Sequence, residues 1–142
     1  MIVRQMKAHD APDVAALSEQ LGYPITAEQI AAKFSTLNAN TDHGFFVAEG
    51  ENTVLGWVHV YGVHLLESDP FAEIGGLVVE ERQRRQGVGR ALMQQSEEWA
   101  RAKGYYCVRL RSGLHRTEAY IFHRQVGYEL IKTAHTFRKI LS

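Results

Sequence analysis

Several features that would assign the chain to a specialised class are scarce or missing. Of 142 residues only Cys107 is a cysteine, so an internal disulfide is excluded and a reducing cytoplasm is the expected location. No stretch approaches the roughly 20 apolar residues of a membrane helix, and the N-terminus does not resemble a secretory signal. Sixteen basic residues balance sixteen acidic ones. We therefore expect a cytoplasmic protein that binds neither nucleic acid nor membranes.

Known metal and phosphate motifs are also missing. No Gly-Lys-Ser/Thr ending of a nucleoside-triphosphate loop is present, and Leu92 stands where the dinucleotide fingerprint needs a third glycine or alanine. His59 and His64 lie five residues apart in a predicted strand, so they point to opposite faces. No further ligand follows at a suitable spacing, and no metal site is expected.

What remains is the pattern of one α/β domain covering residues 1–142. The fraction of apolar residues is 45% and that of charged residues 23%, as in ordinary globular proteins. Asp10 is the expected N-cap of a first helix, and Thr26 with Gln29 the capping box of a second. Further helices are predicted over 88–103 and 117–126, and strands over 2–6, 45–48, 54–63, 71–79 and 106–110, with a final hairpin of 130–131 and 134–141. We expect a mixed, mostly antiparallel central sheet with about four helices on its two faces.

The stretch 78–92 carries the clearest chemical signal. A strand leads into a turn that contains four arginines and two glycines, and a long amphipathic helix follows. Glycine lets a backbone approach a ligand closely, and a helix N-terminus presents unpaired N–H groups and positive charge. This combination favours an anion with several oxygens, most simply a pyrophosphate.

Two segments resemble the motifs of a known family. Arg84-x-x-Gly87-x-Gly89 resembles the acyl-CoA loop of the GNAT superfamily of N-acetyltransferases, and the segment from Ala119 to Tyr128 resembles its second motif. The order of the predicted elements is also similar over nearly the whole chain. The resemblance implies acetyl-CoA as co-substrate and a sheet that splays between its fourth and fifth strands, where the carrier enters.

The resemblance also implies which residues hold the carrier. The central strand would pair with the pantetheine arm, and the loop amides with the first helical residues would hold the pyrophosphate. The expected binding residues are Leu77, Val78, Val79, Arg84, Arg85, Gln86, Gly87, Val88, Gly89 and Arg90.

The same resemblance implies direct transfer of acetyl to a primary amine, with Glu73 as the general base. Glu73 lies in a strand that Gly75 and Gly76 interrupt, a pattern that indicates a bulge or a close approach. Strand physics alone leaves open whether Glu73 is paired in a cleft or merely exposed. A backbone N–H of the bulged Leu77–Val79 strand would stabilise the oxyanion.

The general acid is where the chain departs from the family pattern. His123 stands where the family has a tyrosine that protonates the departing thiolate. A histidine can donate to a thiolate, Tyr120 one turn earlier could act instead, and a thiolate could also leave without either.

The acceptor is not determined by the sequence. A small-molecule amine is our first interpretation. A protein lysine or N-terminus, or a non-catalytic acyl-CoA-binding sensor, are the alternatives. The final hairpin could pair two copies into a homodimer.

Overall fold

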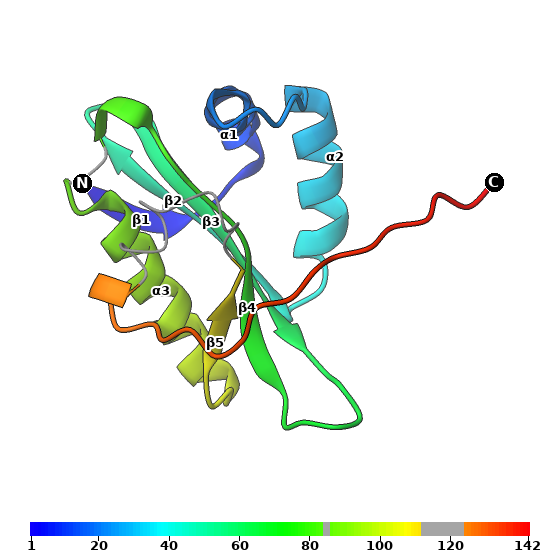
Figure 1. Cartoon of the computed structure of the whole chain (residues 1–142). Helices are drawn as coiled ribbons and strands as arrows, with labels where there is room; N and C mark the ends of the chain where they lie inside the picture. The colour runs from blue at the N-terminus through cyan, green and yellow to red at the C-terminus, as the bar shows by residue number, and fades with distance from the viewer. Residues whose placement is uncertain (84–85, 112–123) are drawn as a thin grey trace. The chain divides into compact units, whose positions relative to one another are not determined.

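A five-stranded sheet organises the first part of the chain. The computed structural model describes residues 1–83, 86–111 and 124–142, and the chain divides into two compact units, Met1–Arg111 and Ser112–Ser142. The first unit has the strand order β1-β2-β3-β4-β5 (Figure 1). The bounds are β1 Ile2–Gln5, β2 His43–Gly50, β3 Thr53–Val63, β4 Phe71–Val79 and β5 Val108–Leu110. Neighbours are antiparallel except β4 and β5, which confirms the mixed, mostly antiparallel sheet.

Helices cover both faces of this sheet, as predicted. They are α1 Ala11–Gln20, α2 Ala27–Asn38 and α3 Val88–Lys103, with single 3-10 turns at η1 Ala8–Asp10 and η2 Glu81–Gln83. A Cβ on Gly56 would meet Leu92 and Val88 of α3, whereas its neighbour Trp57 packs against the core cluster that includes Val14 and Leu17 of α1. Because successive strand residues point to opposite faces, α3 lies on one face and α1 on the other (Figure 1).

The predicted capping box of α2 is confirmed. The Gln29 N–H donates to the Thr26 hydroxyl at 3.1 Å, and the Thr26 N–H donates to the Gln29 side chain at 2.9 Å. Two of the amides that a helix N-terminus leaves unpaired are thereby satisfied by local sequence alone.

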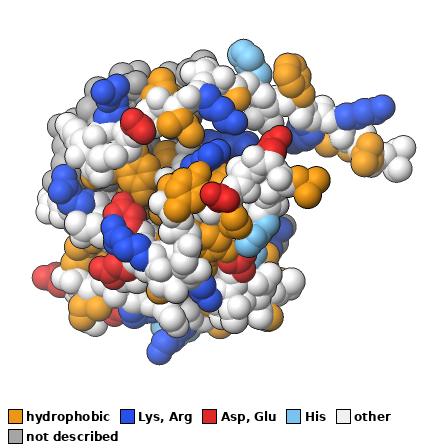
Figure 2. All heavy atoms as spheres, turned by 90° about the horizontal axis from the view of Figure 1, so that it is seen from below, with side chains coloured by type: hydrophobic (Ala, Val, Ile, Leu, Met, Phe, Trp, Pro, Cys, Tyr) orange, Lys and Arg blue, Asp and Glu red, His pale blue; other side chains and the backbone are white. Residues whose placement is uncertain are grey.

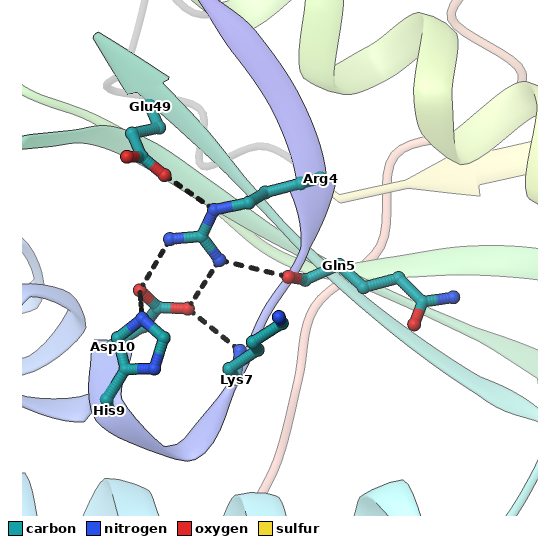
Figure 3. Close-up of polar contacts among 6 residues, drawn as sticks. All are labelled: Arg4, Gln5, Lys7, His9, Asp10 and Glu49. Atoms are coloured by element: carbon teal, nitrogen blue, oxygen red, sulfur yellow. Dashed lines mark hydrogen bonds and ion pairs between the residues drawn. The ribbon is translucent and has the colours of Figure 1, made fainter. Parts of the chain in front are cut away.

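Asp10 is the N-cap residue of α1, as predicted, but its side chain has a stronger partner elsewhere. Its side chain makes no cap hydrogen bond to α1. Instead both of its oxygens accept from the Arg4 guanidinium, at 2.8 and 2.9 Å, and Oδ2 also accepts from the Lys7 N–H (Figure 3). Arg4 Nε donates to Glu49 at 2.6 Å, which ties β1, η1 and β2 together. The hydrogen bonds from Arg4 hold the pKa of the buried Asp10 carboxyl below its usual range.

The second unit departs from the prediction. Arg124 and Gln125 are helical, and Gly127 has φ of 96°, which agrees with the predicted helix end at that glycine. Residues 128–142 contain no strand, so the predicted final hairpin is wrong. An alternating pattern shows only that a segment can pair, and a two-stranded hairpin by itself is marginally stable in water. The prediction of one domain over 1–142 stays a prediction.

Other boundaries move by little. β5 begins at Val108 rather than at residue 106. Within the described ranges, no helix combines the length and the apolar character needed to span a bilayer. Figure 2 shows acidic and basic side chains interspersed with hydrophobic ones on the face seen there, in line with the balanced charge of the sequence.

Candidate active site

Among the described residues, β4 has a strand partner on its β5 side only over its first half. β5 pairs with β4 only at Ala72↔Val108, Glu73↔Arg109 and Ile74↔Leu110. In the part of the chain that the structure describes, no strand pairs with the rest of β4 on that side. The expected splay between the fourth and fifth strands therefore begins after Ile74.

The register of β3 and β4 identifies which backbone groups face this edge. The Glu80 N–H donates to the Leu55 carbonyl at 2.7 Å, so at this position the main chain points toward β3. Antiparallel pairs alternate between hydrogen-bonded and non-hydrogen-bonded positions, so Val78 also points toward β3. Leu77 and Val79 point their N–H and C=O groups the other way, toward the open edge.

A bulge at Gly75 marks the point where the edge opens. His59 pairs with Gly76 and Val60 pairs with Ile74, which leaves Gly75 without an opposite residue. A Cβ on Gly75 would lie 3.1 Å from Tyr61 and 3.2 Å from His59 Nδ1, so glycine lets the exposed backbone lie against these rings without displacing them. The bulge predicted from the paired glycines is confirmed, but it lies before the Leu77–Val79 segment rather than within it.

Glu73 is paired and mostly buried rather than simply exposed. It stands opposite Tyr61 in the register, and the Tyr61 hydroxyl donates to Glu73 Oε2 at 2.5 Å. Arg111 Nε lies 3.9 Å from Glu73 Oε1, and the Glu73 side chain is 17% exposed. Burial, followed by the contact with Glu73, raises the pKa of Tyr61 to about 12, so Tyr61 remains a hydrogen-bond donor.

An imidazole pair lies on the same face of the sheet. His43 Nδ1 and His59 Nε2 are 2.9 Å apart, and the His59 ring stacks on Phe45 with 4.3 Å between centroids. Burial, followed by the charge of His43, lowers the pKa of His59 to about 4, so its ring is neutral at physiological pH. Alternation along each strand indicates that His43 shares a face with Phe45, and His59 with Tyr61. The contact of His43 with His59 and that of Tyr61 with Glu73 could not be inferred from this alternation, because they depend on the register between strands.

The turn before α3 has the properties of an anion site. Gly87 has φ of +84°, is exposed, and has open space where a Cβ would stand. The first turn of α3 contains no acidic residue, and its N-terminus has no side-chain cap. Ala91 N–H donates to the Gly87 carbonyl, so the amides of Val88, Gly89 and Arg90 precede the first bond within the helix and carry its positive end.

Other predicted residues are either outside the described part or engaged differently. Arg84, Arg85, Tyr120 and His123 lie outside the described residues. Gln86 is exposed beside Gly87. Arg82 is exposed, with its Nε 3.7 Å from the Glu80 carboxylate, which also accepts a hydrogen bond from the Arg82 backbone N–H.

A second polar cluster lies on the opposite face of the sheet. The Tyr105 hydroxyl donates to Asp42, and His64 Nε2 lies 3.2 Å from that hydroxyl and 3.3 Å from Asp42. A Cβ on Gly62 would collide with both partners, so this cluster is fitted around a glycine. Among the described residues no group of three His, Cys, Asp or Glu side chains could hold a metal ion.

Most of the chain is similar to known sequences. The model of the acetyltransferase (GNAT) family matches residues 13–128. A protein of Methanocaldococcus jannaschii named as an uncharacterized N-acetyltransferase is 30% identical over 98 residues. The match covers 68% of this chain and 43% of that protein, so the chain spans less than half the length of this curated relative.

Solved structures share the fold along nearly the whole chain. An aminoglycoside 6'-N-acetyltransferase of Acinetobacter haemolyticus, AAC(6')-IG, gives a TM-score of 0.85 at 18% identity, with 100% of both chains covered. The aminoglycoside N-acetyltransferase AAC(6')-Iy in complex with CoA gives 0.84 at 19% identity, covering 99% of this chain and 100% of that one. These similarities confirm the predicted fold class.

Proposed function

Because the chain belongs to the acetyltransferase (GNAT) family, we propose that it transfers the acetyl group of acetyl-CoA directly to a primary amine of a small molecule. The open edge of β4 is the observation that carries this proposal. The edge begins at the Gly75 bulge beside Glu73, and its strand leads into the turn and the N-terminus of α3. One segment of chain thus offers backbone partners for a thioester arm and amides for a diphosphate.

The pantetheine arm would pair with β4 as an added strand does. Leu77 and Val79 supply the outward N–H and C=O groups for this pairing. Val78 keeps its own groups on β3 and its side chain in the core, where it is 4% exposed. Its contribution to the predicted binding set is therefore to hold the strand in place.

The diphosphate would lie at the N-terminus of α3. The amides of Val88, Gly89 and Arg90 point out of the helix end, and Gly87 leaves room for the oxygens. The exposed Arg90 adds a full positive charge. Arg84, Arg85 and Gln86 of the preceding loop complete the proposed set. The CoA complex of AAC(6')-Iy, which shares the fold, supports this choice of carrier.

Glu73 is the proposed general base. An ammonium with a pKa near 10 has no lone pair at neutral pH, so a proton must leave before or during attack. The Tyr61 hydroxyl occupies Glu73 Oε2, and Oε1, whose ion-pair partner Arg111 stands at 3.9 Å, is the oxygen to accept that proton directly or through a water. For the departing thiolate, His123 or Tyr120 stays the predicted donor.

Arg90→Gln tests the diphosphate site. We expect the Kd for CoA to rise about 10-fold, because a hydrogen bond to a charged group contributes at least roughly 1.5 kcal/mol. Isothermal titration calorimetry measures the change, and Arg101→Gln, exposed in the last turn of the same helix, is the matched control. Acetyl-pantetheine lacks the diphosphate, so its Kd should be unchanged by Arg90→Gln. Equal CoA affinity of wild type and Arg90→Gln would remove Arg90 from the site.

The acceptor class is tested by thiol release from acetyl-CoA with aminoglycosides, polyamines, amino acids and peptides. Turnover with small amines is the expected result. Turnover only with lysine or N-terminal peptides would instead indicate a protein acetyltransferase. Heat of CoA binding without turnover of any amine would indicate an acyl-CoA-binding module.

A further inference from the structure

Acetylation of an ammonium removes two protons from its nitrogen, and each needs an acceptor. The first leaves to expose the lone pair, and the second leaves once the C–N bond has formed and the nitrogen again carries positive charge. Glu73 Oε1 can accept only one of them at a time. We infer that His59 and His43 form a relay that takes the second proton at Gly75 and passes it to solvent. This inference rests on the proposed function.

The two nitrogens of His59 face the two ends of such a path. His59 Nδ1 lies 3.2 Å from the point where a Gly75 Cβ would stand, beside the exposed backbone of the bulge. His59 Nε2 lies 2.9 Å from His43 Nδ1. His43 is the first residue of β2 and is half-buried, so its far nitrogen is the one left for contact with water.

Neighbouring rings fix the orientation of His59. Phe45 stacks on it with an interplanar angle of 16°, and the Tyr61 ring lies 5.4 Å from it, centroid to centroid. Of the titratable groups on this face, His43 is within hydrogen-bond distance of His59, and Tyr61 stays protonated because its pKa is raised. The carboxylate of Glu73 is bonded to the Tyr61 hydroxyl, so it forms a separate proton acceptor.

Burial makes a relay necessary rather than a simple base. The same burial that keeps the pKa of His59 near 4 prevents this ring from holding a proton by itself at neutral pH. If the Nε2 proton moves to His43 while Nδ1 receives one, no full charge rests on His59. The positive charge then appears on His43, at the start of β2.

The proton transfers balance as follows. In the resting state His59 Nε2–H donates to His43 Nδ1, and the lone pair of His59 Nδ1 faces Gly75. First, the N–H bond of the acceptor nitrogen breaks and an N–H bond forms at His59 Nδ1. The His59 Nε2–H bond then breaks and an N–H bond forms at His43 Nδ1. Finally, His43 Nε2 gives its proton to water. The electron pair stays on the nitrogen, which becomes the amide as the thiolate leaves. Proton uptake at His43 and loss from His59 Nδ1 at the open bulge restore the first state.

Kinetics of His59→Gln and His43→Gln test the relay, because glutamine can hydrogen-bond but cannot pass a proton. We expect kcat to fall about 100-fold in His59→Gln and by less in His43→Gln, with the KM for acetyl-CoA unchanged. In mixtures of H₂O and D₂O, kcat of the wild type should vary along a curve, as two moving protons require, and that of His43→Gln should vary linearly. His64→Gln, a histidine of the opposite face, is the control and should match the wild type.

A second readout does not depend on turnover. Nitrogen-15 NMR of the imidazoles should show His59 as the neutral Nε2–H tautomer, and finding the Nδ1–H tautomer would overturn the relay. Melting temperature and CoA binding show whether each variant is folded. An active wild type with unchanged kcat in both glutamine variants overturns the relay alone. A wild type that acetylates no amine overturns the relay and the proposed function together.

Discussion

Glu73→Gln should lower kcat by about 10²- to 10⁴-fold, the range that a positioned general base contributes. Glutamine has nearly the same shape and can still accept the Tyr61 hydrogen bond, so the sheet and the neighbouring rings should stay in place. What it cannot do is take a proton from the acceptor amine. Initial rates at saturating acetyl-CoA, with the best acceptor from the amine screen, measure the loss.

Two controls separate loss of the base from loss of the fold. Glu51→Gln removes the same charge from the exposed turn between β2 and β3, and its kcat should equal that of the wild type. CoA binding to Glu73→Gln, measured by calorimetry, should also be unchanged because the diphosphate site is at the other end of β4. A kcat within about twofold of the wild type would exclude Glu73 as the base and leave its contact with Tyr61 to be explained by packing.

Arg4→Met should reduce the free energy of unfolding by about 3–5 kcal/mol, the usual result of removing one partner from a buried ion pair. The Asp10 side chain is 2% exposed and would lose both hydrogen bonds from the guanidinium. Urea unfolding at pH 7 measures the change. Arg82→Met, which removes an exposed ion pair with Glu80, is the matched control and should cost at most about 1 kcal/mol.

The difference in free energy of unfolding between the wild type and Arg4→Met should become smaller as the pH is lowered. In the wild type the folded pKa of Asp10 is depressed, so its contribution is present above the unfolded pKa of about 3.9 and is lost as the pH falls through the folded value. In the variant the buried carboxylate has lost its partner, which raises its folded pKa, and its penalty is relieved when it is protonated. A gap that stays constant between pH 7 and about pH 4 would show that Asp10 is not the group responsible.

Much of the site was accessible from local sequence because its parts depend on near neighbours. Gly87 before an uncapped helix, the glycine pair at the bulge and the capping box at Thr26 are each determined by a few adjacent residues. Their conformations follow from the missing Cβ or from side chains that reach the nearest amides. For this reason the family motif and the glycine turn before α3 could be predicted without any knowledge of long-range contacts.

The departures from local expectation share a different cause. Asp10 has the sequence of an N-cap, yet Arg4, which is also bonded to a residue 45 positions away, captures its side chain. The pattern of residues 130–141 fits a hairpin, yet no pairing is present in the described residues 128–142. In both cases a local preference competes with contacts that only the folded chain supplies.

By itself the sequence determined the family, the glycine turn before α3 and the position of the one central carboxylate. Only the tertiary structure decided that Tyr61 meets Glu73, that His43 meets His59, and that the edge of β4 opens after Ile74. The physical reason is register: one bulge at Gly75 shifts every later pairing of β3 with β4, and a shift of one residue moves a side chain to the other face.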